Sequence, residues 1–197
     1  TVNEEKMSKS LGNFFMVIDI LEHYEPETLR FFILSTHYRS PLDFSDERLA
    51  EAQRSLSRLK TAQENLQALM ALMNAGPTEE SLKLRRKVLE LRNEFMEAMR
   101  DDFNTALAIS HMFALAKEIN IYHQSIVSVG SKPDGKLVSI LQSVFSEMCS
   151  IIGVLESTQG AVEAESCGLE EPLMEMLIAM RQEARSNKDY AQARSEE

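Results

Sequence analysis

The chain has 197 residues and a formal net charge of −10 at pH 7, from 21 lysines and arginines against 31 aspartates and glutamates. A hydrophobic content of 44% is typical of a globular protein and excludes the disordered class, which lacks the apolar residues for a core. Seven glycines and five prolines amount to about half of average usage, which disfavours turn-rich β folds. The composition predicts an all-α fold.

The sequence carries no signal for a membrane or for secretion. No apolar run approaches the roughly 18 residues that span a bilayer, and the first residues lack the basic start and apolar core of a signal peptide. Cys149 and Cys167 form no Cys-x-x-Cys pair, so we expect Cys149 to be a buried apolar side chain and not part of a disulfide or zinc site. We expect a cytoplasmic protein and, because Thr1 is not a methionine, a segment of a longer chain.

The longest amphipathic pattern begins at residue 46. Ser45 can cap a helix there, Asp46 and Glu47 suit its first turn, and the stretch 74–77, Asn-Ala-Gly-Pro, ends it. The positions expected to face the core are Leu49, Ala52, Leu56, Leu59, Leu66, Met70 and Met73, with Gln63 as a polar exception.

Three further helices are predicted after this one. The first follows a Thr78 cap and ends near Arg100, the second starts at Asn104 or Thr105, and the third covers about 136–152. Their expected core positions are Leu82, Val88, Leu89, Phe95, Met96 and Met99, then Ala106, Ile109, Phe113, Ala116 and Ile119, then Leu137, Ile140, Leu141, Val144, Phe145 and Met148. Four helices joined by short loops predict an antiparallel bundle.

The two ends of the chain differ from this bundle. Pro26 suits the first position of a helix that buries Leu29, Phe32 and Ile33, and a shorter helix is expected around 17–22. The polar, acidic stretch 156–168 predicts a flexible linker, and apolar spacing from Leu169 to Met180 predicts one more short helix.

Positive charge gathers only in the middle of the chain, where residues 51–100 carry a net +2. Basic side chains of this kind hold RNA backbones, but they also form ordinary solvated faces paired with glutamates, which is the more common case. The candidate cations are Arg54, Arg58, Lys60, Arg85, Arg86, Lys87 and Arg92, with Arg181, Arg185 and Lys188 near the end of the chain.

One polar segment near the N-terminus has the residues for phosphate chemistry. Residues 6–10 read Lys-Met-Ser-Lys-Ser, which places two ammonium groups three residues apart beside two hydroxyls, and Gly12 allows a tight backbone before the next helix. A lysine ammonium is a compact charge on a long stem and suits a polyphosphate whose charge shifts during reaction. The alternative is a solvated basic loop without a ligand.

This segment, followed by Leu-Gly-Asn-Phe, resembles the second signature motif of class I aminoacyl-tRNA synthetases. Three further segments narrow the resemblance to the cysteinyl-tRNA synthetase family. They are His-Tyr-Arg-Ser-Pro-Leu-Asp-Phe-Ser at 37–45, Asp-Asp-Phe-Asn-Thr-Ala at 101–106, and Ala-Arg at 184–185 with Lys-Asp-Tyr at 188–190.

The resemblance implies an enzyme that activates L-cysteine with ATP and Mg²⁺ and transfers it to tRNA(Cys). Lys9, supported by Lys6, would stabilise the phosphates during activation, and the segment Lys6, Met7, Ser8, Lys9 and Ser10 would contact ATP. The family's other signature and its zinc ligands would lie upstream of Thr1, so we expect no metal site in this chain. Histidines 23, 37, 111 and 123 have no metal-ligand spacing.

The resemblance also divides the chain. It implies the signature loop at 1–13, a stem-contact region at 14–45, an anticodon-binding helical bundle at 46–155, a linker at 156–168 and a truncated C-terminal helix at 169–197. The side chains it suggests for tRNA contact are Arg39, Arg181, Arg185, Lys188 and Tyr190.

Two other functions compete with this one. A helical tRNA- or protein-docking module would carry the lysine loop incidentally. A related ligase that joins cysteine to a sugar amine shares the loop but has no use for the long helical part that follows residue 44. We favour the tRNA ligase, without DNA or membrane partners, and expect this segment alone to be inactive because one loop does not enclose a nucleotide.

Overall fold

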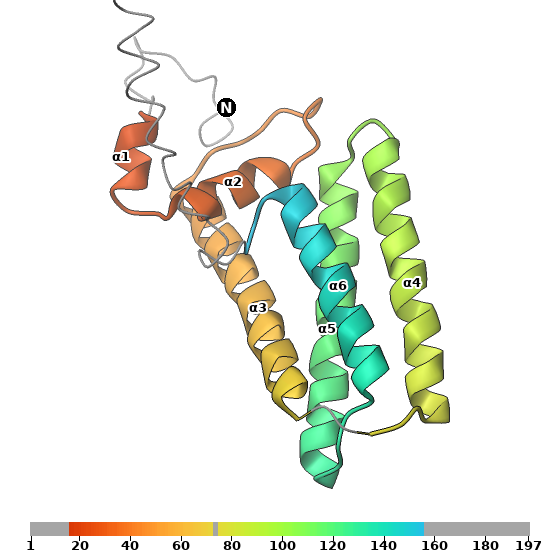
Figure 1. The fold of residues 1–197 in the computed structure, drawn as a ribbon. Helices are drawn as coiled ribbons and strands as arrows, with labels where there is room; N and C mark the ends of the chain where they lie inside the picture. The colour runs from red at the N-terminus through yellow and green to blue at the C-terminus, as the bar shows by residue number, and fades with distance from the viewer. Residues whose placement is uncertain (1–15, 73–74, 156–197) are drawn as a thin grey trace, which may run out of the picture. The chain divides into compact units, whose positions relative to one another are not determined.

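The computed structural model describes residues 16–72 and 75–155, all within the first of the chain's two units, Thr1–Glu156. This part is helical, as the composition predicts (Figure 1). The helices are α1 (Val17–Leu21), α2 (Pro26–Leu34), α3 (Asp46–Ala71), α4 (Glu79–Arg100), α5 (Thr105–Val129) and α6 (Gly135–Ile152). The expected linker and C-terminal helix lie outside the described residues.

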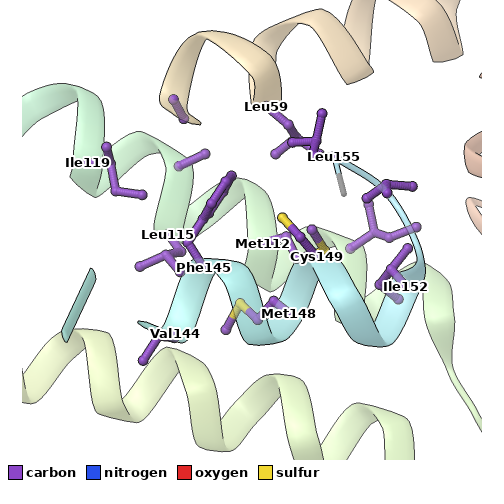
Figure 2. Close-up of a cluster of buried hydrophobic side chains, with 14 of the residues drawn as sticks. Leu59, Met112, Leu115, Ile119, Val144, Phe145, Met148, Cys149, Ile152 and Leu155 are labelled. Atoms are coloured by element: carbon purple, nitrogen blue, oxygen red, sulfur yellow. The ribbon is translucent and has the colours of Figure 1, made fainter. Parts of the chain in front are cut away.

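Four of these helices, α3 to α6, form the antiparallel bundle, and α2 lies across the end where α3 begins and α6 ends (Figure 1). The core is built from apolar stripes on all four bundle helices. Figure 2 shows Leu59 of α3, Met112 of α5 and Phe145 of α6 meeting there, all fully buried. Burial of each side chain of this size contributes about 2 kcal/mol to the stability of the fold, so the bundle is held together chiefly by this core.

The helix boundaries follow local capping chemistry. The Ser45 hydroxyl accepts a hydrogen bond from the backbone N–H of Arg48, and the Asn104 side chain accepts one from Leu107. Thr78 and Ser81 exchange side-chain and backbone hydrogen bonds in a capping box at the start of α4. The three predicted caps are therefore confirmed.

The structure corrects several core positions. The wrong predictions are Ile33, Met70, Leu82 and Leu89, which are exposed. The neighbouring buried positions are Phe31, Leu69, Ser81 and Leu91. A straight helix of 3.6 residues per turn drifts away from a strict 3-4 spacing along α3, and only a narrow stripe of α4 is covered by α5 and α6. A small error in the assumed rotation of a helix about its axis therefore moves a leucine from the predicted core face to solvent.

Helix α6 is long and apolar enough to span a membrane by length and composition alone, among the helices of the described ranges. In the bundle, 44% of this helix is buried, and the buried residues form the stripe that packs into the core. Cys149 on this helix is buried as expected, and burial raises its pKa to about 12. This cysteine therefore stays a neutral, unreactive thiol at physiological pH.

A set of hydrogen bonds, here called the α2 latch, fastens α2 to the chain after α6. Arg30 Nη1 donates to the carbonyl oxygen of Gly153 at 2.6 Å, and the backbone N–H of Leu155 donates to the Glu27 carboxylate. Gln63 of α3 donates to the carbonyl of Leu155 at 3.3 Å. The polar exception in the α3 stripe is thus a partner for the backbone that follows α6.

Gly153 ends α6 with a left-handed backbone, φ 71°, beside Arg30. A Cβ at this position would lie 3.0 Å from Arg30 Nη1. We expect Gly153→Ala to lower the free energy of unfolding by about 2 kcal/mol, because backbone strain adds to displacement of the latch. Gly130→Ala is the control: φ is 65° but the space is open, so about 1 kcal/mol should be lost. Equal losses in urea unfolding would mean that Arg30 moves aside freely.

Candidate nucleic-acid interface

Most of the predicted site residues fall outside the part of the chain that the structure describes. These are Lys6, Met7, Ser8, Lys9 and Ser10 in the signature loop, and Arg181, Arg185, Lys188 and Tyr190 near the C-terminus. Arg39, between α2 and α3, is described, and its surroundings define the site built here.

Arg39 belongs to a cluster that joins two connections of the fold. The Tyr38 hydroxyl donates to Asp102 Oδ1 at 2.6 Å, and Arg39 Nη2 donates to the same oxygen at 3.1 Å. Arg39 Nε lies 3.0 Å from the other carboxylate oxygen. Tyr38 and Arg39 lie in the α2–α3 connection, whereas Asp102 lies in the turn between α4 and α5, at the same end of the bundle (Figure 1). We call Tyr38, Arg39 and Asp102, with His37, the tip cluster.

The rings and charges of the tip cluster are arranged around Asp102. The His37 ring stacks on Tyr38 with centroids 5.0 Å apart, and the Arg39 guanidinium lies 5.5 Å from the Tyr38 ring centroid. The hydrogen bond to Asp102 raises the pKa of Tyr38 above its ordinary value, so Tyr38 stays a neutral donor at physiological pH. His37 accepts a hydrogen bond at Nδ1 from the backbone N–H of Arg39.

Arg39 is thus paired inside the protein but not enclosed by it. Its side chain remains 68% exposed, and its guanidinium has five N–H donors, of which the contacts above use two. The remaining edge faces solvent and can reach a phosphate. Contact between Arg39 and tRNA therefore stays a prediction that the local geometry permits.

Of the seven other candidate cations on the described helices, four are paired with carboxylates. The pairs are Lys60 with Glu25 and Glu27, Arg85 with Asp134, Lys87 with Glu118, and Arg92 with Glu147. Arg54 and Arg58 on α3 are exposed and form no ion pair with the described residues. Arg58 lies over the ring of Phe113, 5.1 Å from its centroid. These two arginines are the cations of α3 best placed to meet an RNA backbone.

No metal centre accompanies these side chains. Within residues 16–72 and 75–155, no group of three or more His, Cys, Asp and Glu side chains is placed to hold a metal ion. His37 Nε2 lies 3.9 Å from Asp102, and His111 Nδ1 lies 3.2 Å from Glu94, so each of these histidines has a carboxylate neighbour of its own.

Two family models match separate parts of the chain. Residues 1–54 match the class I (C) tRNA synthetase catalytic domain, and residues 94–156 match the DALR domain, an all-helical anticodon-binding domain. The first match contains the signature loop and Arg39, and the second contains Asp102. The tip cluster therefore joins the two matched segments.

Curated relatives match nearly the whole chain. A cysteine–tRNA ligase of Desulforamulus reducens is 42% identical, and one of Pelotomaculum thermopropionicum is 43% identical, each over 98% of this chain. One of Heliobacterium modesticaldum is 41% identical over the same share. The chain spans about two fifths of the length of these relatives. By this similarity the chain belongs to the cysteine–tRNA ligase family.

Proposed function

We propose that this chain is the part of a cysteine–tRNA ligase that supplies an ATP-phosphate-binding loop and a tRNA-binding helical domain. The observation that carries the proposal is the identity of more than 40% to cysteine–tRNA ligases over 98% of the chain. The order of the two matched segments supports it, since catalytic-domain residues precede the DALR residues. In this proposal the division of the chain is 1–13, 14–45, 46–155, 156–168 and 169–197, with the roles that the resemblance implies.

The loop would act on the phosphates of ATP. In the reaction, the carboxylate of L-cysteine attacks the α-phosphorus of Mg²⁺-bound ATP, cysteinyl-adenylate forms, and pyrophosphate leaves with the electron pair of the broken P–O bond. Lys9 would stabilise the charge that develops on the phosphates, and Lys6, Ser8, Ser10 and Met7 would shape the loop around them. A zinc ion that selects the cysteine thiol is part of the family resemblance, and we assign it no residue of this chain.

The helical part would hold tRNA(Cys) while the cysteinyl group moves to it. Positive side chains on the exposed surface suit the RNA backbone, and aromatic rings suit unpaired bases. The tRNA contacts proposed are Arg39, Arg181, Arg185, Lys188 and Tyr190. Of the other candidate cations from the sequence, we include Arg54 and Arg58, and their exposure supports this choice. We place this reaction in the cytoplasm.

Aminoacylation tests the proposal. The ligase that contains this chain should attach cysteine to tRNA(Cys) with ATP and Mg²⁺, and should show cysteine-dependent exchange of pyrophosphate into ATP. The 197-residue chain alone should do neither, because one loop does not enclose ATP. If the full-length protein bound tRNA but did not activate cysteine, the docking-module alternative would be favoured. If the 197-residue chain alone catalysed pyrophosphate exchange, the assignment of the loop as only part of an active site would be refuted.

A further inference from the structure

The turn between α4 and α5 holds two consecutive residues in a strained backbone conformation. Asp102 has φ 55° and Phe103 has φ 52°, and neither is a glycine. For residues with a Cβ, this left-handed region is disfavoured because the Cβ comes too close to the following carbonyl oxygen. Such strain persists only where surrounding contacts determine the conformation, and it is concentrated at functional sites.

The contacts that determine this turn come from both sides. Asp102 is held from the α2–α3 connection by Tyr38 and Arg39. The backbone N–H of Asn104 donates to the carbonyl of Ala98 at 3.1 Å, and the Asn104 side chain caps α5. The strained residues are therefore fixed between a helix end, a helix start and the tip cluster.

The result of this fixed geometry is an aromatic ring directed to solvent. Phe103 is 68% exposed, the largest exposed fraction of a phenylalanine in the described ranges, and the nearby Tyr38 is 62% exposed. The fold gains little from burial of Phe103, since most of its ring stays in water. Packing therefore does not account for a strained turn that presents this side chain.

The charges beside Phe103 leave a small negative excess, because two ion pairs form here and Asp101 has no ion pair with the described residues. Arg39 is paired with Asp102, and Arg100 is paired with Glu97 at 2.6 Å. This surface does not attract phosphate strongly, yet it offers two exposed rings and the open edge of a guanidinium. Unpaired RNA bases stack on such rings, because every base has a π face. The apolar area is also small for a protein interface, since the residues flanking Phe103 are the polar Asp102 and Asn104.

We propose that Phe103, supported by Tyr38, whose hydroxyl binds the neighbouring Asp102, stacks on an unpaired base of the tRNA bound by the ligase. This inference rests on the proposed function, because it assumes that the ligase binds tRNA. Asp102 is then a positioning residue, which keeps the turn in the conformation that presents the ring.

The test uses the full-length ligase that contains this chain and tRNA(Cys) as the probe. Phe103→Ala and Phe103→Leu should weaken tRNA binding by about 5- to 100-fold, the range for loss of one stacked base. Phe103→Trp keeps a ring and should bind within a few-fold of wild type. Cysteine-dependent pyrophosphate exchange without tRNA should be unchanged in all three. An unchanged dissociation constant in Phe103→Ala would overturn the proposal.

Two controls separate stacking from structural and ionic effects. Phe103→Gly removes the ring and relieves the strain, so it should weaken tRNA binding without lowering the melting temperature. Stacking is also insensitive to salt: Phe103→Ala should leave the salt dependence of tRNA binding unchanged, whereas Arg54→Gln should reduce its slope by about 1. A fall in melting temperature or in pyrophosphate exchange equal to the loss of tRNA binding would show that Phe103 packs against another part of the ligase.

The outcomes also separate this inference from the proposed function. If the wild-type ligase activates cysteine and charges tRNA(Cys) but Phe103→Ala binds tRNA normally, only the stacking role is wrong. If the wild-type ligase neither activates cysteine nor binds tRNA(Cys), the proposed function fails, and the stacking role fails with it.

Discussion

Replacing Lys9 with alanine in the full-length ligase should slow formation of cysteinyl-adenylate by about 100- to 1,000-fold. That is the size of effect when one preorganised group that stabilises transition-state charge is removed from an active site. Because the ammonium would act on phosphates that change charge only during activation, the affinity for tRNA(Cys) should change little. Pyrophosphate exchange measures the first quantity, and filter binding of labelled tRNA measures the second.

Two variants of the same loop serve as controls. Lys9→Arg keeps the positive charge but replaces a compact ammonium with a planar fork, so it should recover only part of the activity. Lys6→Ala should cost less than Lys9→Ala if Lys6 mainly shapes the loop. Equal losses of adenylate formation and tRNA affinity in Lys9→Ala would instead mean that Lys9 is a general RNA contact.

Replacing Asp134 with alanine should lower the free energy of unfolding by about 3–5 kcal/mol, the cost of breaking a buried ion pair. Asp134 is 4% exposed and accepts hydrogen bonds from the Ser81 hydroxyl at 2.7 Å and from Arg85 at 2.5 Å. It also caps α6 through the backbone N–H groups of Lys136 and Leu137. The variant leaves these donors without their acceptor inside the protein.

A matched pair on the same helices provides the control. Arg92 and Glu147 form a two-bond ion pair, but both side chains are about one-third exposed. Water screens this pair, so Glu147→Ala should cost no more than about 1 kcal/mol. Urea unfolding of both variants gives the comparison. If Glu147→Ala costs as much stability as Asp134→Ala, burial does not determine how much an ion pair contributes here.

The same carboxylate predicts a dependence of stability on pH. Burial opposes ionisation of Asp134, but the hydrogen bonds from Ser81, Arg85 and the first turn of α6 outweigh it and lower its pKa. A lowered pKa gives stability that is complete above the unfolded value, about 3.9, and is lost as the pH falls through the folded value. Asp134→Asn should therefore flatten the decline in stability below about pH 4, which acid titration of unfolding measures.

Local chemistry made the helices predictable. The caps at Ser45, Thr78 and Asn104 act over three residues, so sequence alone locates them. The buried face of each helix is harder to predict from the sequence than its ends. The exposure of Leu82 and Leu89, for example, depends on which sides of α4 are covered by α5 and α6.

The site was predictable only in part. The signature loop and Arg39 are found from their motifs, but motif matching gives no role to Tyr38, Asp102 or Phe103. The contact between Tyr38 and Asp102 depends on the packing of two connections that lie more than 60 residues apart in the sequence. The positive φ values of Asp102 and Phe103 are equally hard to predict, because neither residue is a glycine. The segments 37–45 and 101–106 each carry a motif of their own. The sequence feature that could indicate their contact is the presence of a tyrosine and an arginine in one segment and an aspartate able to bind both in the other.

The α2 latch also bears on how such a chain can be inherited. Residues 1–54 and 94–156 match different family models, yet Glu27 and Arg30 of the first segment hold Leu155 and Gly153 at the end of the second. The atoms held on the second segment are a backbone carbonyl and a backbone N–H, which every relative supplies, so a chimera of two relatives joined near residue 54 should keep the latch as long as α2 supplies the glutamate and the arginine. The side chains that make these two bonds are therefore inherited with the first segment alone.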